Sequence, residues 1–145
     1  MELAKGDCRL RRRTPLLVAS LLLAVATLHA QLPAPSGAIN DFADLLTTEQ
    51  EQQLTTLVEE VEDATTAEIA VATVTSLDGM SVEEYAVRLF AQWGIGQADK
   101  DNGVLVLVAQ SDRKMRIEVG YGLEPVLTDL ATGRILDQIV RAKFR

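Results

Sequence analysis

Two glycine-containing segments hold the side chains of this sequence that are best suited to chemistry. Residues 94–103 precede an apolar run, and residues 120–129 lead into a run of helical periodicity. Their candidate ligands are the side-chain oxygens of Asp99, Asp101, Asn102, Glu124 and Asp129. Carboxylate and amide oxygens are the ligands that Ca²⁺ and Mg²⁺ prefer. The pattern is not an EF-hand loop, because counting from Asp99 places Val104 where that loop requires glycine.

Each of these residues also has a purely structural interpretation. The Asp-Asn-Gly sequence that begins at Asp101 is a common turn, and the Gly-Tyr-Gly sequence that begins at Gly120 is typical of a tight turn. Asp129 precedes a helical pattern, and aspartate is a common N-cap residue. A binding site is therefore expected only if the fold brings the two segments to one edge of a sheet.

The rest of the sequence excludes several kinds of catalytic site. The single cysteine, Cys8, and the single histidine, His29, both lie in the N-terminal segment 1–30. Without them, residues 31–145 cannot form a Cys/His zinc site, a thiol nucleophile or a Ser-His-Asp triad. The glycines from Gly120 onward do not complete a dinucleotide-binding fingerprint, because Pro125 stands where the third glycine is required.

The charge is unevenly distributed along the chain. The chain has 145 residues and a formal net charge of -7, and its 48% hydrophobic content is typical of a single globular domain. Positions 1–30 hold five of the 14 basic and two of the 21 acidic side chains, which leaves nine basic and nineteen acidic in residues 31–145. Such an acidic body repels phosphate backbones, so the composition argues against nucleic-acid binding and favours cations as partners.

The N-terminal segment 1–30 has the order of a secretory signal peptide. A basic run at 9–13 is followed by an apolar run at 16–28 and then by small residues. The apolar run is too short for a membrane-spanning helix, which needs about 20 residues. We expect cleavage after Ala30, with residues 24–26 as a second candidate site and an uncleaved anchor as the alternative. The protein is then periplasmic or extracellular, or membrane-associated if the leader is retained or a C-terminal tail is missing.

Local patterns predict six elements after an extended linker at residues 31–40. Capping-box sequences at Thr48 and Ser81 begin two amphipathic helices, and a polar turn at Ser111 joins two strands into a hairpin. The elements are a helix over 48–64, a strand over 68–75, a helix over 82–93, strands over 104–109 and 115–119, and a helix that begins at Thr128 or Asp129.

This alternation indicates an α/β fold. Apolar strands between amphipathic helices predict a three-layer sandwich, in which a small mixed β-sheet has helices on both faces. The domain organisation is then a secretory signal peptide at 1–30, the linker at 31–40 and one α/β domain at 41–145.

Five ordered strings of this sequence resemble the signatures of the TPM domain family over about residues 39–145. They are NDFA at 40–43, WGIG at 93–96, DNGVL at 101–105, RIEVGYGLE at 116–124 and LTD at 127–129. That family includes thylakoid-lumen phosphatase and photosystem-repair proteins and bacterial exported proteins. The resemblance implies an α/β sandwich, divalent-cation binding with Ca²⁺ as the best supported ion and Mg²⁺ as the alternative, and a weak acid-phosphatase activity.

The resemblance also implies which residues form the site. The metal ligands it implies are Asp41, Asp101, Asn102, Glu124 and Asp129. Further acidic positions near these motifs are Asp44, Asp99 and Glu118. Arg116 and Arg134 are candidates for binding phosphate, although an arginine near acidic loops is more often an ion-pair partner.

Three functions follow from these observations. The favoured one is an exported Ca²⁺-binding accessory domain that acts through an envelope protein partner in maintenance or repair. The alternative is a metal-assisted phosphomonoesterase, in which the ion polarises a phosphoryl oxygen and a carboxylate serves as nucleophile or base. The first is favoured because residues 31–145, which lack histidine and cysteine, offer no obvious base or nucleophile of matched pKa. A third interpretation is a purely structural domain without an ion.

Overall fold

The computed structural model describes residues 31–143, so the predicted leader lies outside the described residues, as do residues 144 and 145. Within residues 31–143 the chain forms four strands and three helices. In chain order they are β1 (Ile39–Asp41), α1 (Thr48–Thr65), β2 (Glu68–Val74), α2 (Val82–Trp93), β3 (Gly103–Ala109), β4 (Lys114–Val119) and α3 (Asp129–Lys143). No helix in this range is both long and apolar enough to cross a membrane.

The four strands form one mixed sheet in the order β1-β2-β3-β4. β1, β2 and β3 are parallel, and β3 pairs with β4 as the predicted antiparallel hairpin. Two edges follow from this topology. The amino ends of β1, β2 and β3 lie with the carboxyl end of β4 at one edge, the amino edge, and the opposite strand ends form the carboxyl edge.

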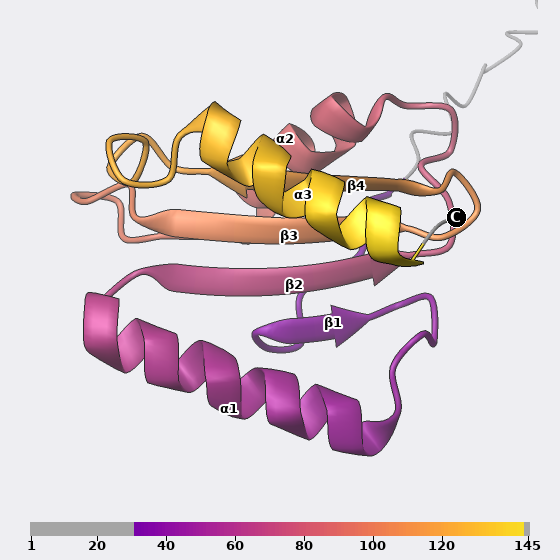
Figure 1. Cartoon of the computed structure of the whole chain (residues 1–145), viewed down its shortest axis with the longest axis horizontal. Helices are drawn as coiled ribbons and strands as arrows, with labels where there is room; N and C mark the ends of the chain where they lie inside the picture. The colour runs from indigo at the N-terminus through magenta and orange to yellow at the C-terminus, as the bar shows by residue number, and fades with distance from the viewer. Residues whose placement is uncertain (1–30, 144–145) are drawn as a thin grey trace, which may run out of the picture.

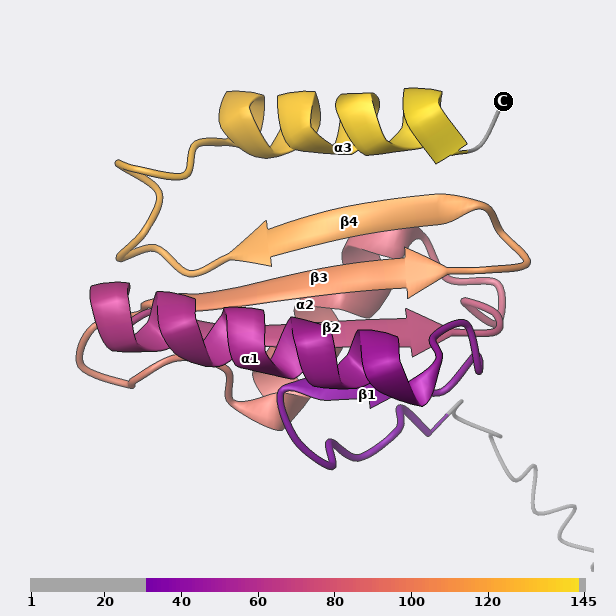
Figure 2. The same ribbon diagram turned by 60° about the horizontal axis from the view of Figure 1, so that its bottom comes forward.

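Helices cover both faces of the sheet, which confirms the predicted three-layer α/β sandwich. α2 lies on one face, whereas α1 and α3 lie on the other (Figures 1 and 2). The α2 face holds the main core, because Leu89 of α2 packs in one buried cluster with Leu105 and Leu107 of β3. These three leucines are fully buried. Burying such side chains contributes about 1.5–3 kcal/mol each, so this face carries much of the stability.

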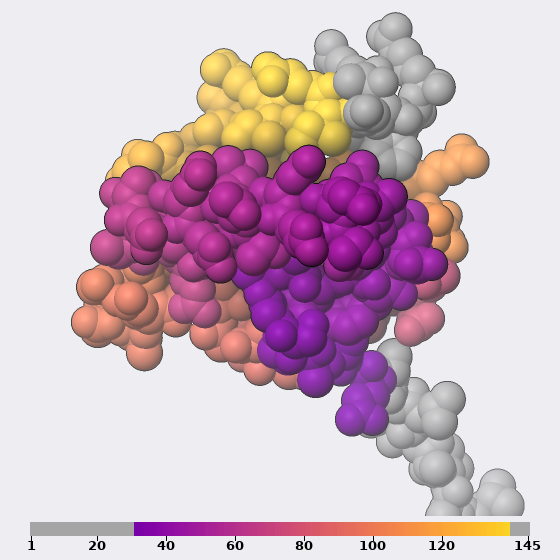
Figure 3. Space-filling model, turned by 90° about the horizontal axis from the view of Figure 1, so that it is seen from below, coloured from indigo at the N-terminus to yellow at the C-terminus, as the bar shows by residue number. Residues whose placement is uncertain are grey.

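The opposite face is less completely covered. In the view from below, α1 crosses the β1 side of the molecule and α3 lies above it (Figure 3). Leu57 of α1 and Leu130 of α3 remain exposed, and Val106 in the middle of β3 is only half-buried. The sheet is therefore packed tightly under α2 and more loosely under α1 and α3.

Side-chain caps begin each helix, with one shift from the sequence prediction. The capping box of α1 is formed by Thr47 and Gln50, one residue earlier than expected: Thr47 Oγ1 accepts from the Gln50 N–H at 3.3 Å, and Gln50 Oε1 accepts from the Thr47 N–H at 2.9 Å. Ser81 caps α2 as predicted. For α3 the cap is Thr128, whose hydroxyl accepts from the Ala131 N–H at 3.3 Å.

The strand β1 was not predicted, because residues 31–40 read as an extended linker. Ile39–Asp41 pair in parallel with Val71–Thr73 of β2. Three residues are too few for a periodic pattern, and the middle one is a buried asparagine, Asn40, which a polarity pattern does not assign to a sheet. The domain core therefore includes residues that precede its first helix.

Candidate functional site

The two loops that carry most of the candidate ligands lie side by side at the amino edge. One connects α2 to β3 at residues 94–102, and the other connects β4 to α3 at residues 120–128. The Gly120 N–H donates to the Gly103 carbonyl at 2.8 Å, and the Gly122 N–H donates to the Asp101 carbonyl at 3.0 Å. These two backbone hydrogen bonds join the loops directly.

Glycine is required at positions 120 and 122, where the two loop backbones lie in close contact. A Cβ atom on Gly122 would overlap the carbonyl oxygen of Lys100, and one on Gly120 would overlap the carbonyl oxygen of Asp101. Both neighbours are backbone atoms, which cannot move aside as the end of a side chain can. The Gly-Tyr-Gly sequence therefore serves as the contact between two loops rather than only as a turn.

Three of the five implied ligands are exposed at this edge. Asp101 adopts a left-handed conformation with φ of 47°, which aspartate tolerates better than most residues. Glu124 lies in the second loop, and Asp129 is the first residue of α3. All three side chains face solvent, so they keep oxygens available for a cation.

Asn102 lies at the same edge, but its amide group is already engaged. The side chain is 6% exposed. Its Oδ1 accepts from the Gln97 N–H at 2.8 Å, and its Nδ2 donates to the Thr66 carbonyl. Asn102 thus links the loop after α2 to the end of α1, and its observed role is to hold this edge together.

Asp41 lies at the opposite edge of the sheet from the other four residues. It pairs with Thr73, five residues along β2 from Glu68, and Glu68 is level with Gly103 at the start of β3. At about 3.3 Å per residue, the two positions are roughly 16 Å apart. Ca²⁺–oxygen bonds are only about 2.3–2.6 Å long, so the implied set of five does not surround one ion. The physical reason is that Asp41 ends a strand, whereas Asp101 precedes a parallel one.

The carboxylate of Asp41 serves the loop that follows β1. It accepts from the Leu46 N–H at 2.7 Å and from the hydroxyl of Thr73. Burial alone raises the pKa of Asp41, but the hydrogen bonds from Thr73 and from backbone N–H groups outweigh burial and lower it. Asp41 is therefore ionised at neutral pH, and its carboxylate already accepts hydrogen bonds from the protein. Asp44, in the same loop, is exposed and has a left-handed backbone with φ of 52°.

Arg116 forms an ion pair rather than an open phosphate site. Its Nη2 lies 3.1 Å from Glu118 Oε2, and its Nε donates to the same oxygen. Both residues lie on the α2 face of β4, since they are paired with Leu107 and Leu105. The ion-pair interpretation of Arg116 is confirmed, and Glu118 lines the strand. Arg134 is exposed on α3.

The available donors fit a cation only in part. Among residues 31–143, no three acidic, histidine or cysteine side chains form a group that could hold a metal ion. A cation at the joined loops would therefore take oxygens from at most two of the exposed carboxylates of Asp101, Glu124 and Asp129. Its remaining ligands would be backbone carbonyls and water. That donor set suits Ca²⁺, which accepts six to eight oxygens in flexible geometry, better than Mg²⁺, which demands a near-ideal octahedron.

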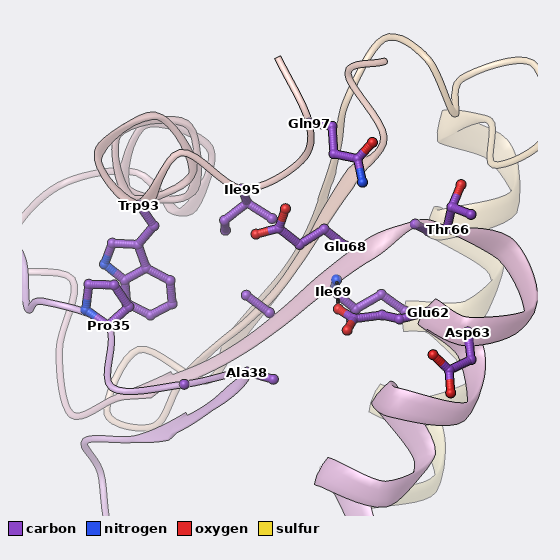
Figure 4. A pocket seen from close by; sticks show the side chains of 13 residues that line it. Pro35, Ala38, Glu62, Asp63, Thr66, Glu68, Ile69, Trp93, Ile95 and Gln97 are labelled. Atoms are coloured by element: carbon purple, nitrogen blue, oxygen red, sulfur yellow. Dashed lines mark hydrogen bonds between the residues drawn. The ribbon is translucent and has the colours of Figure 1, made fainter. Parts of the chain in front are cut away.

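A cleft at the same edge was missed by the sequence analysis. It has a volume of about 720 Å³ and lies between the end of α1, the start of β2 and the end of α2 (Figure 4). Trp93 and Glu68 line it, although the sequence patterns placed Trp93 only at the end of the amphipathic helix 82–93 and Glu68 only at the start of the strand 68–75. One sequence signal could have indicated this cleft. Trp93 is the last residue of the helix and precedes a glycine, so residues of the next turn cannot cover its ring.

Comparisons with known proteins agree with this architecture. A family model described as the TPM domain matches residues 39–145. The solution structure of the N-terminal domain of a protein from P. gingivalis is similar at 31% sequence identity and a TM-score of 0.69, covering 74% of this chain and 69% of that chain. The N-terminal domain of the cg2496 protein from Corynebacterium glutamicum is similar in fold, with 16% identity, a TM-score of 0.59 and coverage of 79% and 72%. A comparison with curated proteins finds no significant match.

Proposed function

The chain belongs to the TPM domain family, and from this premise we propose that it is an exported accessory domain that binds Ca²⁺ at its amino edge and contacts envelope proteins. The observation that carries the proposal is the backbone contact between the two loops. The hydrogen bond from Gly122 to Asp101 keeps carboxylates of two separate segments at one edge, where a single ion can engage both. Export is supported by the basic, apolar and small-residue order of the N-terminal segment 1–30.

The donor set supports a weak and reversible site. At most two carboxylates leave much of a calcium shell to backbone carbonyls and water. Sites of low ligand charge bind with dissociation constants of about 10⁻⁴–10⁻³ M in extracellular modules. The excess of acidic side chains in residues 31–145 repels anionic partners. A bound cation lowers this repulsion locally and holds the two loops more firmly.

The β4–α3 loop also supports contact with another protein. Tyr121 is 79% exposed and Val126 is 84% exposed, and both flank Glu124 in this loop. Large apolar side chains beside an ion site can be buried by a partner once the ion has neutralised the carboxylates. Envelope maintenance or repair is the setting that this family membership favours.

Calcium binding is tested by thermal unfolding of the purified protein in chelator and in rising CaCl₂, with MgCl₂ in parallel. Saturation at a hundredfold excess over Kd stabilises the native state by about 2.7 kcal/mol. Asp101→Asn and Asp129→Asn should each lose most of this gain and melt no lower than wild type in chelator, because removing one carboxylate relieves repulsion.

The matched control is Asp78→Asn. Asp78 is also exposed and left-handed, with φ of 50°, but follows β2 at the carboxyl edge. It should keep the full calcium response. If both test variants keep the full response, or if the control loses it equally, the loop carboxylates do not bind the ion.

Phosphomonoester hydrolysis has less support. The guanidinium of Arg116 is paired with Glu118, and the carboxylate of Asp41 already accepts from Leu46 and Thr73. Neither group is therefore free to bind phosphate or to attack it. A metal-assisted phosphatase should depend on divalent ions and keep constant specific activity through purification, which a contaminating activity would not.

A further inference from the structure

The cleft at the amino edge has two chemically different walls. Glu62 and Asp63 of α1 line one side, Trp93 and Ile95 line the other, and Glu68 of β2 lies between them (Figure 4). In Figure 4 the side chain of Glu68 points away from Glu62 and toward Ile95. At about 720 Å³ the cleft is within the range of about 300–1,000 Å³ typical of ligand sites.

The floor of the cleft is an open strand edge. β1 pairs only with Val71–Thr73, so within residues 31–143 no strand pairs with Glu68–Ala70 on the β1 side. The Ile69 N–H points to this side and donates to Glu62 Oε1 at 2.8 Å. A side chain thus occupies the position that a neighbouring strand would take in a longer sheet.

Asn40 keeps this edge open. Its Oδ1 accepts from the Ser36 N–H at 2.7 Å, and its Nδ2 donates to the Gly37 carbonyl at 2.8 Å. These bonds fold the chain into a turn just before β1, so the preceding residues do not continue along β2. The indole N–H of Trp93 then donates to the Pro33 carbonyl at 2.8 Å, which holds the incoming segment against the apolar wall.

The three carboxylates that line the cleft favour a cationic ligand. Arg88 pairs with Glu84 and Arg116 pairs with Glu118, and none of the three cleft carboxylates is paired with a described cation. Among the side chains that the structure describes, no lysine or arginine lines the cleft. The three carboxylates also do not form a group that could hold a metal ion, which favours an extended organic cation.

We propose that this cleft binds an extended peptide segment carrying a lysine or arginine side chain. A carbonyl of the peptide accepts from the Ile69 N–H and displaces Glu62, as in the addition of a strand to a sheet edge. The freed Glu62 and Glu68 then pair with the ammonium or guanidinium group. Trp93 offers its ring to the same cation, since a cation over an indole face is attracted by the ring quadrupole.

The test uses the purified protein in EDTA, so that it does not depend on the proposed calcium site. The probe is a blocked pentapeptide of alternating threonine and valine with lysine at its centre. Trp93 is the only tryptophan of the chain, so its fluorescence reports binding without a label. The amide signal of Ile69 in nuclear magnetic resonance spectra should shift with the same dissociation constant. Replacing the lysine by norleucine should weaken binding by roughly fivefold or more.

Glu68→Gln should weaken binding of the lysine peptide by a similar factor and leave the norleucine peptide unaffected. Its matched control is Glu59→Gln, an exposed glutamate of α1 outside the cleft, which should leave binding unchanged. The proposal is overturned if the lysine peptide leaves Trp93 fluorescence unchanged at millimolar concentration. Equal binding of both peptides, or binding of spermidine as tight as that of the lysine peptide, also overturns it.

Discussion

Replacing Gly122 by alanine should separate the two loops of the amino edge. The added methyl group would lie closer to the Lys100 carbonyl oxygen than the 3.0 Å that real Cβ atoms keep. One loop must therefore move, and the hydrogen bond from the Gly122 N–H to Asp101 is the contact that this movement breaks. No left-handed backbone angle contributes here, because Gly122 is not among the glycines with positive φ.

The magnitude follows from two contributions. Forcing extra atoms into a packed contact costs about 1–3 kcal/mol, and losing the hydrogen bond costs about 1 kcal/mol. A total of about 2–4 kcal/mol lowers the melting temperature of a chain of this length by roughly 10 °C. Differential scanning calorimetry measures this directly, and the amide signal of Asp101 should shift in the same variant.

Gly133→Ala is the matched control for this substitution. Gly133 lies within α3, and a Cβ atom there meets nothing within 4 Å. Alanine should therefore raise stability by about 0.5–1 kcal/mol through its helix propensity. If Gly122→Ala melts within a degree of wild type and leaves the Asp101 amide unchanged, the loops are not joined through this contact. If the variant is destabilised yet keeps its calcium response, the contact exists but the ion does not depend on it.

Two further substitutions test the hydrogen bonds at the two edges. The folded-state pKa of Asp41 is lowered from 3.8, so its contribution to stability is present above the unfolded pKa and is lost as the pH falls through the folded pKa. Urea unfolding at pH 7 and pH 3 should therefore show a smaller acid loss in Asp41→Asn than in wild type, and equal losses would contradict this. Asn102→Ala leaves the Gln97 N–H and the Thr66 carbonyl without their partner and should cost about 1–3 kcal/mol in the same assay. An unfolding free energy equal to that of wild type would show that water replaces the amide.

The layers of the fold could be predicted from the sequence because each element has a strong local signal. The helix that begins after Ser81 has its cap, its apolar stripe and its glycine stop at Gly94. The strand Gly103–Ala109 is an uninterrupted apolar run, and its hairpin partner follows a short polar turn. These features depend on neighbours in the chain, so no knowledge of the tertiary structure is needed to find them.

The composition of the site could not be predicted in the same way, because it depends on strand direction. Asp41 and Asp101 share a residue type and a similar loop setting in the sequence. Their separation becomes visible only once Ile39–Asp41 is recognised as a strand parallel to β2. The cleft at Trp93 was missed for a related reason. Its floor is the stretch Glu68–Ala70 of β2, which pairs with β3 but not with β1. No sequence pattern distinguishes a strand segment that is paired on one side only.

The two edges differ mainly in what the carboxylates of their loops already bind. Ligands of open α/β sheets usually lie beyond the carboxyl ends of the strands. Here two carboxylates at that edge accept from backbone N–H groups of the loops beside them: Asp41 from Leu46 at 2.7 Å, and Asp112 from Leu77 at 2.9 Å. At the amino edge, backbone hydrogen bonds donated by Gly120 and Gly122 hold the loops instead, together with the amide of Asn102. The carboxylates of Asp101 and Glu124 take no part in the hydrogen bonds that hold these loops, so both side chains stay available to a ligand. The amino edge is therefore the better candidate for binding, although ligands of open α/β sheets usually lie at the carboxyl edge.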